Sequence, residues 1–132
     1  MINQEAKFLI FSGGISVGDY DFVRSVLDEC EVKCGFHKIA QKPGKPLYFG
    51  QKNDKYIFAL PGNPASALTC FYEYVFPAIQ QFLGNNFREL TTINVPLLKG
   101  ISKKAGLANF LKGNFDGKTV EALNGQDSFI MR

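Results

Sequence analysis

The order of apolar and polar positions predicts four strands in the first part of the chain. Residues 7–11, 47–49 and 56–60 are short apolar runs of the kind found in buried strands, and residues 36–40 alternate as a half-buried strand does. The first run stops at a serine and two glycines, which is typical of a parallel strand that ends at the edge of its sheet.

Two segments have the periodicity of amphipathic helices. Over residues 19–30 the apolar side chains recur at helical spacing, and acidic residues occupy the first turn, where the helix dipole favours them. Residues 65–83 form the second segment, with Asn63 suited to the N-cap and Pro64 to the first helical position. Pro77 should bend or divide this second helix.

The pattern changes after Gly84, which suits the left-handed end of a helix. The strand and helix order up to this point favours a layered α/β domain. Beyond it, Gly, Asn and Asp turns separate four short strand candidates, at residues 91–98, 109–111, 119–123 and 128–131. We therefore predict an α/β unit at residues 1–84 and a second, all-β unit at residues 85–132 that the chain leaves incomplete.

Composition and charge narrow the possible functions mainly by exclusion. The apolar fraction of 45% is enough for a core, and the net charge of +3 is too weak and dispersed to indicate a nucleic-acid groove. The apolar runs fall far short of the roughly 20 residues that span a bilayer, and the N-terminus lacks a secretory pattern. We expect a cytoplasmic protein with neither a nucleic-acid nor a membrane partner.

The cysteines and the single histidine do not form a recognisable metal or disulfide pattern. Three cysteines are an odd number, and one histidine adds little to a zinc site. We expect Cys30 and Cys70 to be reduced core residues, leave Cys34 open, and interpret His37 as a partly buried structural residue.

Three loops carry the chemistry that suggests a site. They occupy residues 12–19, 42–46 and 60–66, and an open α/β sheet places its ligands at such strand ends. Glycines allow close approach of the backbone, and serine hydroxyls together with free N–H groups at a helix start suit phosphate or another oxyanion. Lys42 and Lys45 would supply the counter-charge.

Asp19 and Asp21 would repel an anion unless a cation lies between them. A hard divalent ion such as Mg2+, bridging carboxylate and phosphate, resolves this conflict and suggests metal-assisted handling of a phosphate or phosphoanhydride. The alternative for each feature taken singly is structural: a glycine turn, helix-start acids and a solvated lysine pair. Their occurrence at three successive strand ends favours the site.

In this order and spacing, the three loops resemble the signatures of the MoeA family of molybdopterin molybdenumtransferases, to which the gephyrin E domain is related. The resemblance covers roughly residues 8–84. It implies a three-layer molybdopterin-binding-like α/β domain, incomplete at its N-terminus, followed by part of a small β-barrel domain. It also implies a cytoplasmic homodimer that inserts molybdate into adenylylated molybdopterin and releases AMP with the help of Mg2+. A molybdopterin adenylyltransferase is then a candidate partner.

The resemblance also assigns roles to residues. Asp21 would serve hydrolysis or metal positioning with Asp19 beside it, so both would be catalytic and metal-binding residues. Lys42, Lys45 and Ser66 would receive molybdate, with Lys38 as a further basic contact. The full set expected to bind the pterin substrate or molybdate comprises Ser12, Gly13, Gly14, Ser16, Gly18, Lys38, Lys42, Gly44, Lys45, Pro46, Pro61, Gly62, Asn63, Pro64 and Ser66.

Two departures from the family pattern limit these expectations. Members of the family are much longer, so the chain is expected to be a fragment with little activity alone. The family also has an arginine in a Gly-Arg-x-x-Phe pattern where this chain has Leu107, between Gly106 and Phe110. The loss of this cation predicts weaker molybdate binding.

Two other functions stay open. A related molybdopterin adenylyltransferase would carry a Gly-Gly-Thr-Gly loop, which residues 13–16 do not match. A non-catalytic scaffold module, such as gephyrin provides at synapses, is favoured by Leu107, whereas Asp21, Lys42 and Lys45 favour the enzyme.

Overall fold

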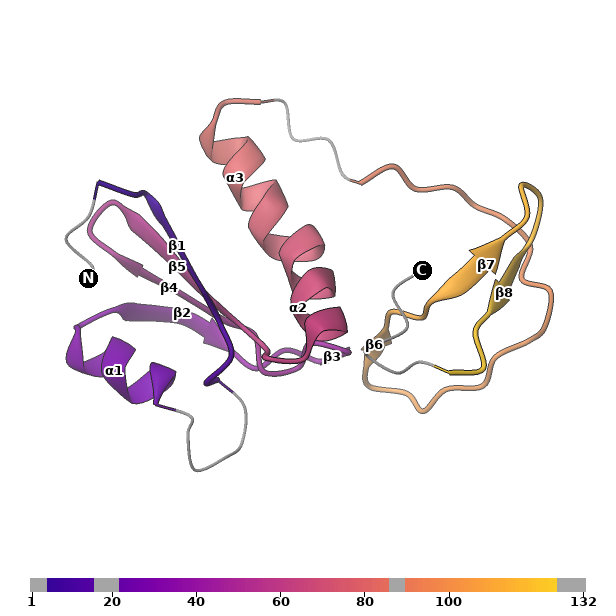
Figure 1. The fold of residues 1–132 in the computed structure, drawn as a ribbon, viewed down its shortest axis with the longest axis horizontal. Helices are drawn as coiled ribbons and strands as arrows, with labels where there is room; N and C mark the ends of the chain where they lie inside the picture. The colour runs from indigo at the N-terminus through magenta and orange to yellow at the C-terminus, as the bar shows by residue number, and fades with distance from the viewer. Residues whose placement is uncertain (1–4, 16–21, 86–89, 126–132) are drawn as a thin grey trace.

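A four-stranded mixed sheet organises the first part of the chain in the computed structural model, which describes residues 5–15, 22–85 and 90–125. The strand order is β1–β5–β4–β2, as Figure 1 shows. The four strands are β1 (Phe8–Ser12), β2 (Lys33–His37), β4 (Tyr48–Lys52) and β5 (Lys55–Leu60).

The direction of the strands determines where the loops lie. β1 pairs in parallel with β5, from Phe8 opposite Tyr56 to Ser12 opposite Leu60, which confirms the predicted parallel strand. β4 runs antiparallel to both β5 and β2. The carboxyl ends of β1 and β5 and the start of β4 therefore lie at one edge of the sheet, where the three loops begin or end.

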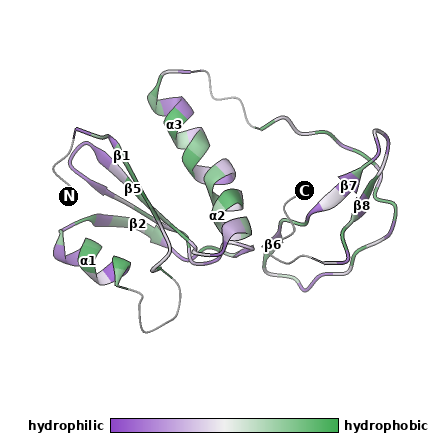
Figure 2. Ribbon diagram, in the orientation of Figure 1, coloured by the Kyte–Doolittle hydropathy of each residue, from purple (hydrophilic) through white to green (hydrophobic). Residues whose placement is uncertain are grey.

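Helices cover both faces of the sheet, which gives the three layers expected from the sequence (Figure 1). α1 (Val23–Glu29) covers one face. A continuous helical segment covers the other, and it consists of α2 (Pro64–Cys70), a π-helical turn η1 (Phe71–Val75) and α3 (Phe76–Phe82). Figure 2 shows hydrophobic residues along the strands enclosed between these helices.

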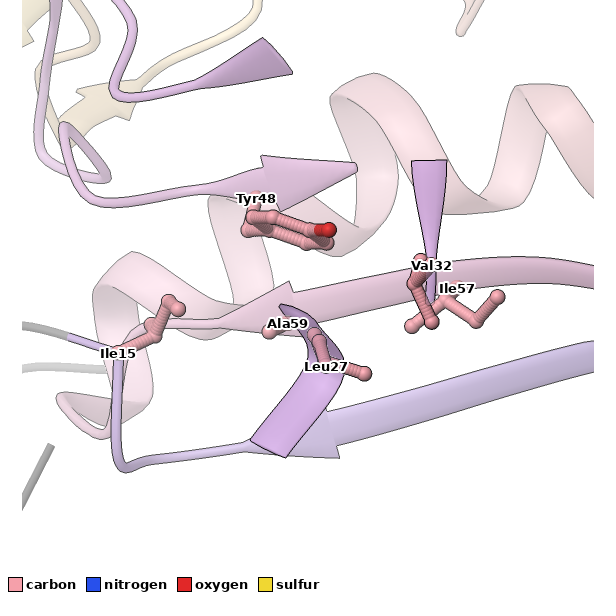
Figure 3. Close-up of a cluster of buried hydrophobic side chains, with 6 residues drawn as sticks. All are labelled: Ile15, Leu27, Val32, Tyr48, Ile57 and Ala59. Carbon is pink, nitrogen blue, oxygen red and sulfur yellow. The ribbon is translucent and has the colours of Figure 1, made fainter. Parts of the chain in front are cut away.

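The alternation of side chains along β5 divides the core into two clusters. Ile57 and Ala59 pack on the α1 side, in the cluster of Figure 3, whose other members are Ile15, Leu27, Val32 and Tyr48. Phe58 and Leu60 point to the opposite side, where they pack with Leu47, Cys70 and Val75. Because successive strand residues face opposite sides, one apolar strand supplies both clusters.

The ends of the long helical segment agree with the sequence. The Asn63 side chain accepts a hydrogen bond from the Ser66 N–H at 3.1 Å, and Pro64 occupies the first turn. At the other end, Gly84 has a φ of 72°, and its N–H donates to the Gln81 carbonyl at 3.1 Å. The glycine in a left-handed conformation ends the helix as predicted.

Pro77 coincides with a change in helical geometry. Proline has no N–H to donate to the carbonyl four residues earlier, here that of Glu73. The wider π-helical turn ends at Val75, two residues before Pro77. The helix thus accommodates the proline by widening one turn, and it continues beyond Pro77 as α3.

The strand predictions at residues 36–40 and 91–98 differ from the structure. β2 begins at Lys33 and ends at His37, earlier than the predicted 36–40, because its pairing with β4 selects the register. Residues 91–98 form only an isolated bridge, between Leu97 and Val120, and Pro96 has no N–H with which to extend the pairing. The fourth prediction of the second unit, residues 128–131, lies outside the described residues.

The remaining strands are short. β3 (Gln41–Lys42) pairs in parallel with β6 (Ala108–Asn109), and β7 (Gly113–Phe115) forms an antiparallel hairpin with β8 (Val120–Ala122). β7 was not predicted because its glycine and asparagine have low strand propensity. The strands within residues 90–125 do not close a barrel. The division of the chain at Gly84 stays a prediction.

No helix in the described ranges has the length and apolar character needed to cross a membrane.

Replacing Ile57 by alanine should destabilise the fold strongly. Ile57 is fully buried between β5 and α1, so its truncation should lower the free energy of unfolding by about 2–5 kcal/mol, measured by urea denaturation. Ile10→Ala is the matched control, because Ile10 is 43% exposed on β1 and should cost about 1 kcal/mol or less. Equal losses for the two variants would contradict the described layer packing.

Candidate functional site

A cleft of about 440 Å³ lies between the start of α2 and residues from the second part of the chain. The 42–46 loop contributes Lys42 to its lining, and the 60–66 loop contributes Asn63 and Ser66. The cleft therefore joins two of the three loops that the sequence predicted to form a site. The other lining residues are Pro43, Ala65, Leu68, Thr69, Tyr72, Glu73, Leu90, Lys103, Asn109, Phe110, Leu111 and Lys112.

The first turn of α2 forms one wall. Ser66 is 9% exposed, and its hydroxyl donates to the Asn63 side-chain oxygen at 3.1 Å, next to the capping bond from the Ser66 N–H. The hydroxyl must turn away from Asn63 before it can donate to a bound anion. Asn63 therefore fixes the backbone of the turn and controls the orientation of the Ser66 hydroxyl.

A buried glutamine holds the loop that carries Lys42. Gln41 is 2% exposed, and its side-chain nitrogen donates to the Pro43 carbonyl at 2.8 Å. The Tyr74 hydroxyl, from the helical segment, donates to the Gln41 side-chain oxygen at 2.6 Å. Both ends of the glutamine amide are satisfied, so the loop is tied to the helix beneath it.

Gly44 lets the same loop pack closely on α2. Its φ is 105°, and a Cβ at this position would lie 2.5 Å from the Cys70 sulfur and 2.9 Å from the Gln41 side-chain nitrogen. The Cys70 thiol donates to the Gly44 carbonyl at 3.6 Å. Both the positive φ and the close approach require glycine here.

The second part of the chain forms the opposite wall through the β3–β6 pair. The Ala108 N–H donates to the Ala40 carbonyl and the Phe110 N–H to the Lys42 carbonyl, both at 2.9 Å. Figure 1 shows β6 beside β3 near the start of α2. These bonds place residues 109–112 beside the 42–46 loop.

The described part of the first loop lies at the same edge of the sheet but does not line this cleft. The Gly13 N–H donates to the Leu60 carbonyl at 3.0 Å, and a Cβ on Gly13 would lie 3.9 Å from the Cα of Gly62. The Gly14 carbonyl accepts from the N–H of Val23 at the start of α1. The first and third loops therefore touch, and the first loop also connects to α1.

The structure separates the other expected site residues into two groups. Those that lie outside the cleft lining are Ser12, Gly13, Gly14, Lys38, Gly44, Lys45, Pro46, Pro61, Gly62 and Pro64. Ser16, Gly18, Asp19 and Asp21 lie outside the described residues. In the described ranges no group of three or more His, Cys, Asp or Glu side chains could hold a metal ion. The metal-binding role of the two aspartates stays a prediction.

The cleft is electropositive. Three lysines, Lys42, Lys103 and Lys112, line it against one carboxylate, Glu73, so the lining has a net formal charge of +2. Sequence reasoning missed Lys103 and Lys112 because nothing in their local pattern connects them to the loops. The signal that brings them to the site is the β3–β6 pairing, which is a tertiary contact.

The titratable groups beneath the cleft are neutral packing residues. Burial raises the pKa of the Cys70 thiol to about 11. Burial, followed by the proximity of Cys70 and Glu73, raises the pKa of Tyr74. Both side chains therefore stay protonated near neutral pH, and each serves as a hydrogen-bond donor to the 42–46 loop or its glutamine.

His37 lies apart from the cleft and is half-buried, as expected. Its Nδ1 lies 2.9 Å from a guanidinium nitrogen of Arg24. Burial lowers the pKa of His37, and the positive charges of Arg24 and Lys38 lower it further. Since a guanidinium only donates, Nδ1 is the acceptor and the imidazole is neutral. This contact joins α1 to β2, which is a structural role.

Comparison with known proteins identifies the family of the α/β part. The model of a family described as "Probable molybdopterin binding domain" matches residues 1–81, which is more than half of the chain. The chain belongs to the molybdopterin-binding domain family. This match spans all three loops and the whole four-stranded sheet.

Curated relatives of the chain carry names from molybdenum-cofactor synthesis. The chain is 36% identical to the Drosophila melanogaster molybdenum cofactor synthesis protein cinnamon, over 93% of this chain and 23% of that protein. It is 38% identical to a molybdopterin molybdenumtransferase of Haemophilus influenzae, over 83% of this chain and 27% of that protein. The chain thus spans about a quarter of the length of these relatives.

A solved structure supports the same arrangement. The molybdopterin biosynthesis MoeA protein from Pyrococcus horikosii superposes with a TM-score of 0.73 at 27% identity, over 92% of this chain and 29% of that chain. The superposition extends beyond the α/β layers into the second part of the molecule.

Gly44→Ala should destabilise the protein. The added methyl group would collide with the Cys70 sulfur, and an alanine would be strained at the positive φ of this position. We therefore expect the free energy of unfolding to fall by about 2 kcal/mol or more. Gly100→Ala is the control, because a Cβ at Gly100 would meet no atom within 4 Å, and it should change stability by about 0.5 kcal/mol or less. Chemical denaturation of both variants measures the difference. Similar losses of stability in the two variants would refute the close packing at Gly44.

The cysteines should differ in reactivity. Cys34 is exposed and Cys70 is buried with a pKa of about 11, and only the thiolate reacts with iodoacetamide. At about pH 8 we therefore expect Cys34 to be alkylated in the folded protein and Cys70 only after denaturation. Peptide mass spectrometry distinguishes the two sites. Equal labelling rates in the folded protein would contradict the burial of Cys70.

Proposed function

We propose that this chain provides part of the substrate site of an enzyme that inserts molybdate into adenylylated molybdopterin and releases AMP. The observation that carries the proposal is the meeting of Lys42 and Ser66, from two separate loops, in one electropositive cleft. The membership in the molybdopterin-binding family and the names of the relatives support the same chemistry.

The proposed roles follow from what each group can donate. Lys42 provides a flexible ammonium group at the cleft. Ser66 provides a hydroxyl that leaves Asn63 when it donates its hydrogen bond to an anion instead. Lys38 precedes the 42–46 loop and Lys45 lies within it; both are exposed and raise the local positive potential. The glycines at positions 13, 14 and 62 leave the edge of the sheet open to a phosphate group.

Mg2+ is the cation that this proposal requires. Asp19 and Asp21 would hold it, because two carboxylates supply the hard oxygen ligands that Mg2+ prefers. When bound, the ion offsets the charge of the phosphoanhydride. The lysines and Ser66 of the described loops act independently of it, by binding and orienting the anionic oxygens.

The alternative of a non-catalytic scaffold module is favoured only by the residue at position 107. Leu107, which stands where the resembling family has arginine, is 45% exposed and does not line the cleft. Lys42, Lys103 and Lys112 supply positive charge to the cleft without that arginine, which supports the enzyme over the scaffold module. A homodimer and a molybdopterin adenylyltransferase partner belong to the proposal for the whole enzyme.

The proposal predicts weak oxyanion binding that depends on Lys42. Molybdate, tungstate or sulfate should bind at low ionic strength with a Kd on the order of millimolar, because the cleft is open and solvent screens its charges. Lys42→Ala should weaken binding by about threefold to tenfold, since a charged contact at the surface contributes modestly. Lys45→Ala should have a smaller effect because Lys45 does not line the cleft.

Isothermal titration or fluorescence titration measures these effects. Lys33→Ala serves as the charge-matched control, because Lys33 is exposed on β2 and is not part of the cleft lining. Equal binding by the wild type, Lys42→Ala and Lys33→Ala would show that the lysine of the loop is only a solvated charge, and the proposed site would be wrong.

A further inference from the structure

The cleft contains two cations that the sequence motifs do not include. Lys103 and Lys112 come from the segment that follows the long helix, and they line the same cavity as Lys42. Lys103 is exposed and Lys112 is half-buried. The cleft therefore receives positive charge from two parts of the chain that are about 60 residues apart in sequence.

Backbone pairing fixes the position of Lys112, but not that of Lys103, relative to Lys42. The Phe110 N–H donates to the Lys42 carbonyl at 2.9 Å, and Asn109 is the registered partner of Lys42 in the β3–β6 pair. Lys112 follows Phe110 by two residues, and its carbonyl accepts a 2.9 Å hydrogen bond from the Leu123 N–H. The segment is thus held at both ends, which favours binding by a preformed site.

The size and lining of the cleft indicate a ligand larger than a single tetrahedral oxyanion. Its volume of about 440 Å³ falls within the usual range of small-molecule sites, roughly 300–1,000 Å³. Tyr72 and Phe110 add aromatic surface to the lining. Cations on both walls suit a ligand whose negative charges are spread over several oxygen atoms, as in a phosphoanhydride.

We propose that Lys103 and Lys112 bind the phosphoanhydride oxygens of the substrate across the cleft from Lys42, and so select a polyanion over a single oxyanion. The inference rests on the proposed function, since it assigns further binding residues to the same site. Leu107 lies between these two lysines in sequence, so the segment keeps its cations although position 107 has none.

Inorganic pyrophosphate is the probe that tests this proposal, with sulfate as the single oxyanion. Both anions are titrated at low ionic strength into the 132-residue chain, its Lys103→Ala, Lys112→Ala double variant and the Lys42→Ala variant. The control is Lys99→Ala, because Lys99 belongs to the same segment but pairs with Glu121 at 2.6 Å and does not line the cleft. Lys103→Arg, Lys112→Arg keeps both charges and tests for rescue.

We expect the double alanine variant to bind pyrophosphate about tenfold more weakly, the combined size expected for two partly exposed charged contacts. Its sulfate affinity should change by less than about threefold. The double arginine variant should retain pyrophosphate binding, and Lys99→Ala should match the wild type. The dependence of binding on salt should also be less steep for the double alanine variant.

The other outcomes are distinguishable. If Lys42→Ala weakens both anions while the double alanine variant binds pyrophosphate like the wild type, this inference is wrong and the proposed function stands. If Lys99→Ala weakens pyrophosphate as much as the double alanine variant, the effect is general surface charge and the inference is again wrong. If the wild type binds neither anion, both the inference and the proposed function fail.

Discussion

The burial of β5 on both faces is the constraint on which the rest of the structure depends. Ile57 and Ala59 support α1, whereas Phe58 and Leu60 support the long helical segment. Burying each large apolar side chain stabilises the fold by roughly 1.5–3 kcal/mol. Because β1 pairs in parallel with this strand, both strands end at one edge, and their loops meet there.

Buried contacts beneath the 42–46 loop support the candidate site at that edge of the sheet. Gln41 connects the Pro43 carbonyl to the Tyr74 hydroxyl, while Gly44 packs against the Cys70 sulfur. These contacts are uncharged, and burial keeps the thiol and the phenol protonated by raising the pKa of each. Because neutral groups hold the loop in place, the fold does not require the lysines to be buried, and they remain available to the anion that we propose.

One wall of the cleft comes from the loops that carry the sequence motifs, and the other comes from a segment without a motif. Lys42, Asn63 and Ser66 come from the recognisable loops, whereas Lys103, Phe110 and Lys112 come from a segment of low strand content. In the described residues, the β3–β6 pair joins the two walls through two paired residues on each strand. The anion site that we propose needs no larger contact, because charge and hydrogen bonding act across this one.

The local elements and the chemistry of the loops could be predicted from the sequence. The apolar run that stops at Ser12, the Asn63 cap and the helix end at Gly84 were predictable, because each depends on interactions within a few residues. The register of β2 and the β3–β6 pair were set by the tertiary structure. It also decided that Lys42 and Ser66 share a cleft while Lys45 does not line it. These features depend on contacts between residues distant in sequence, which no local pattern encodes.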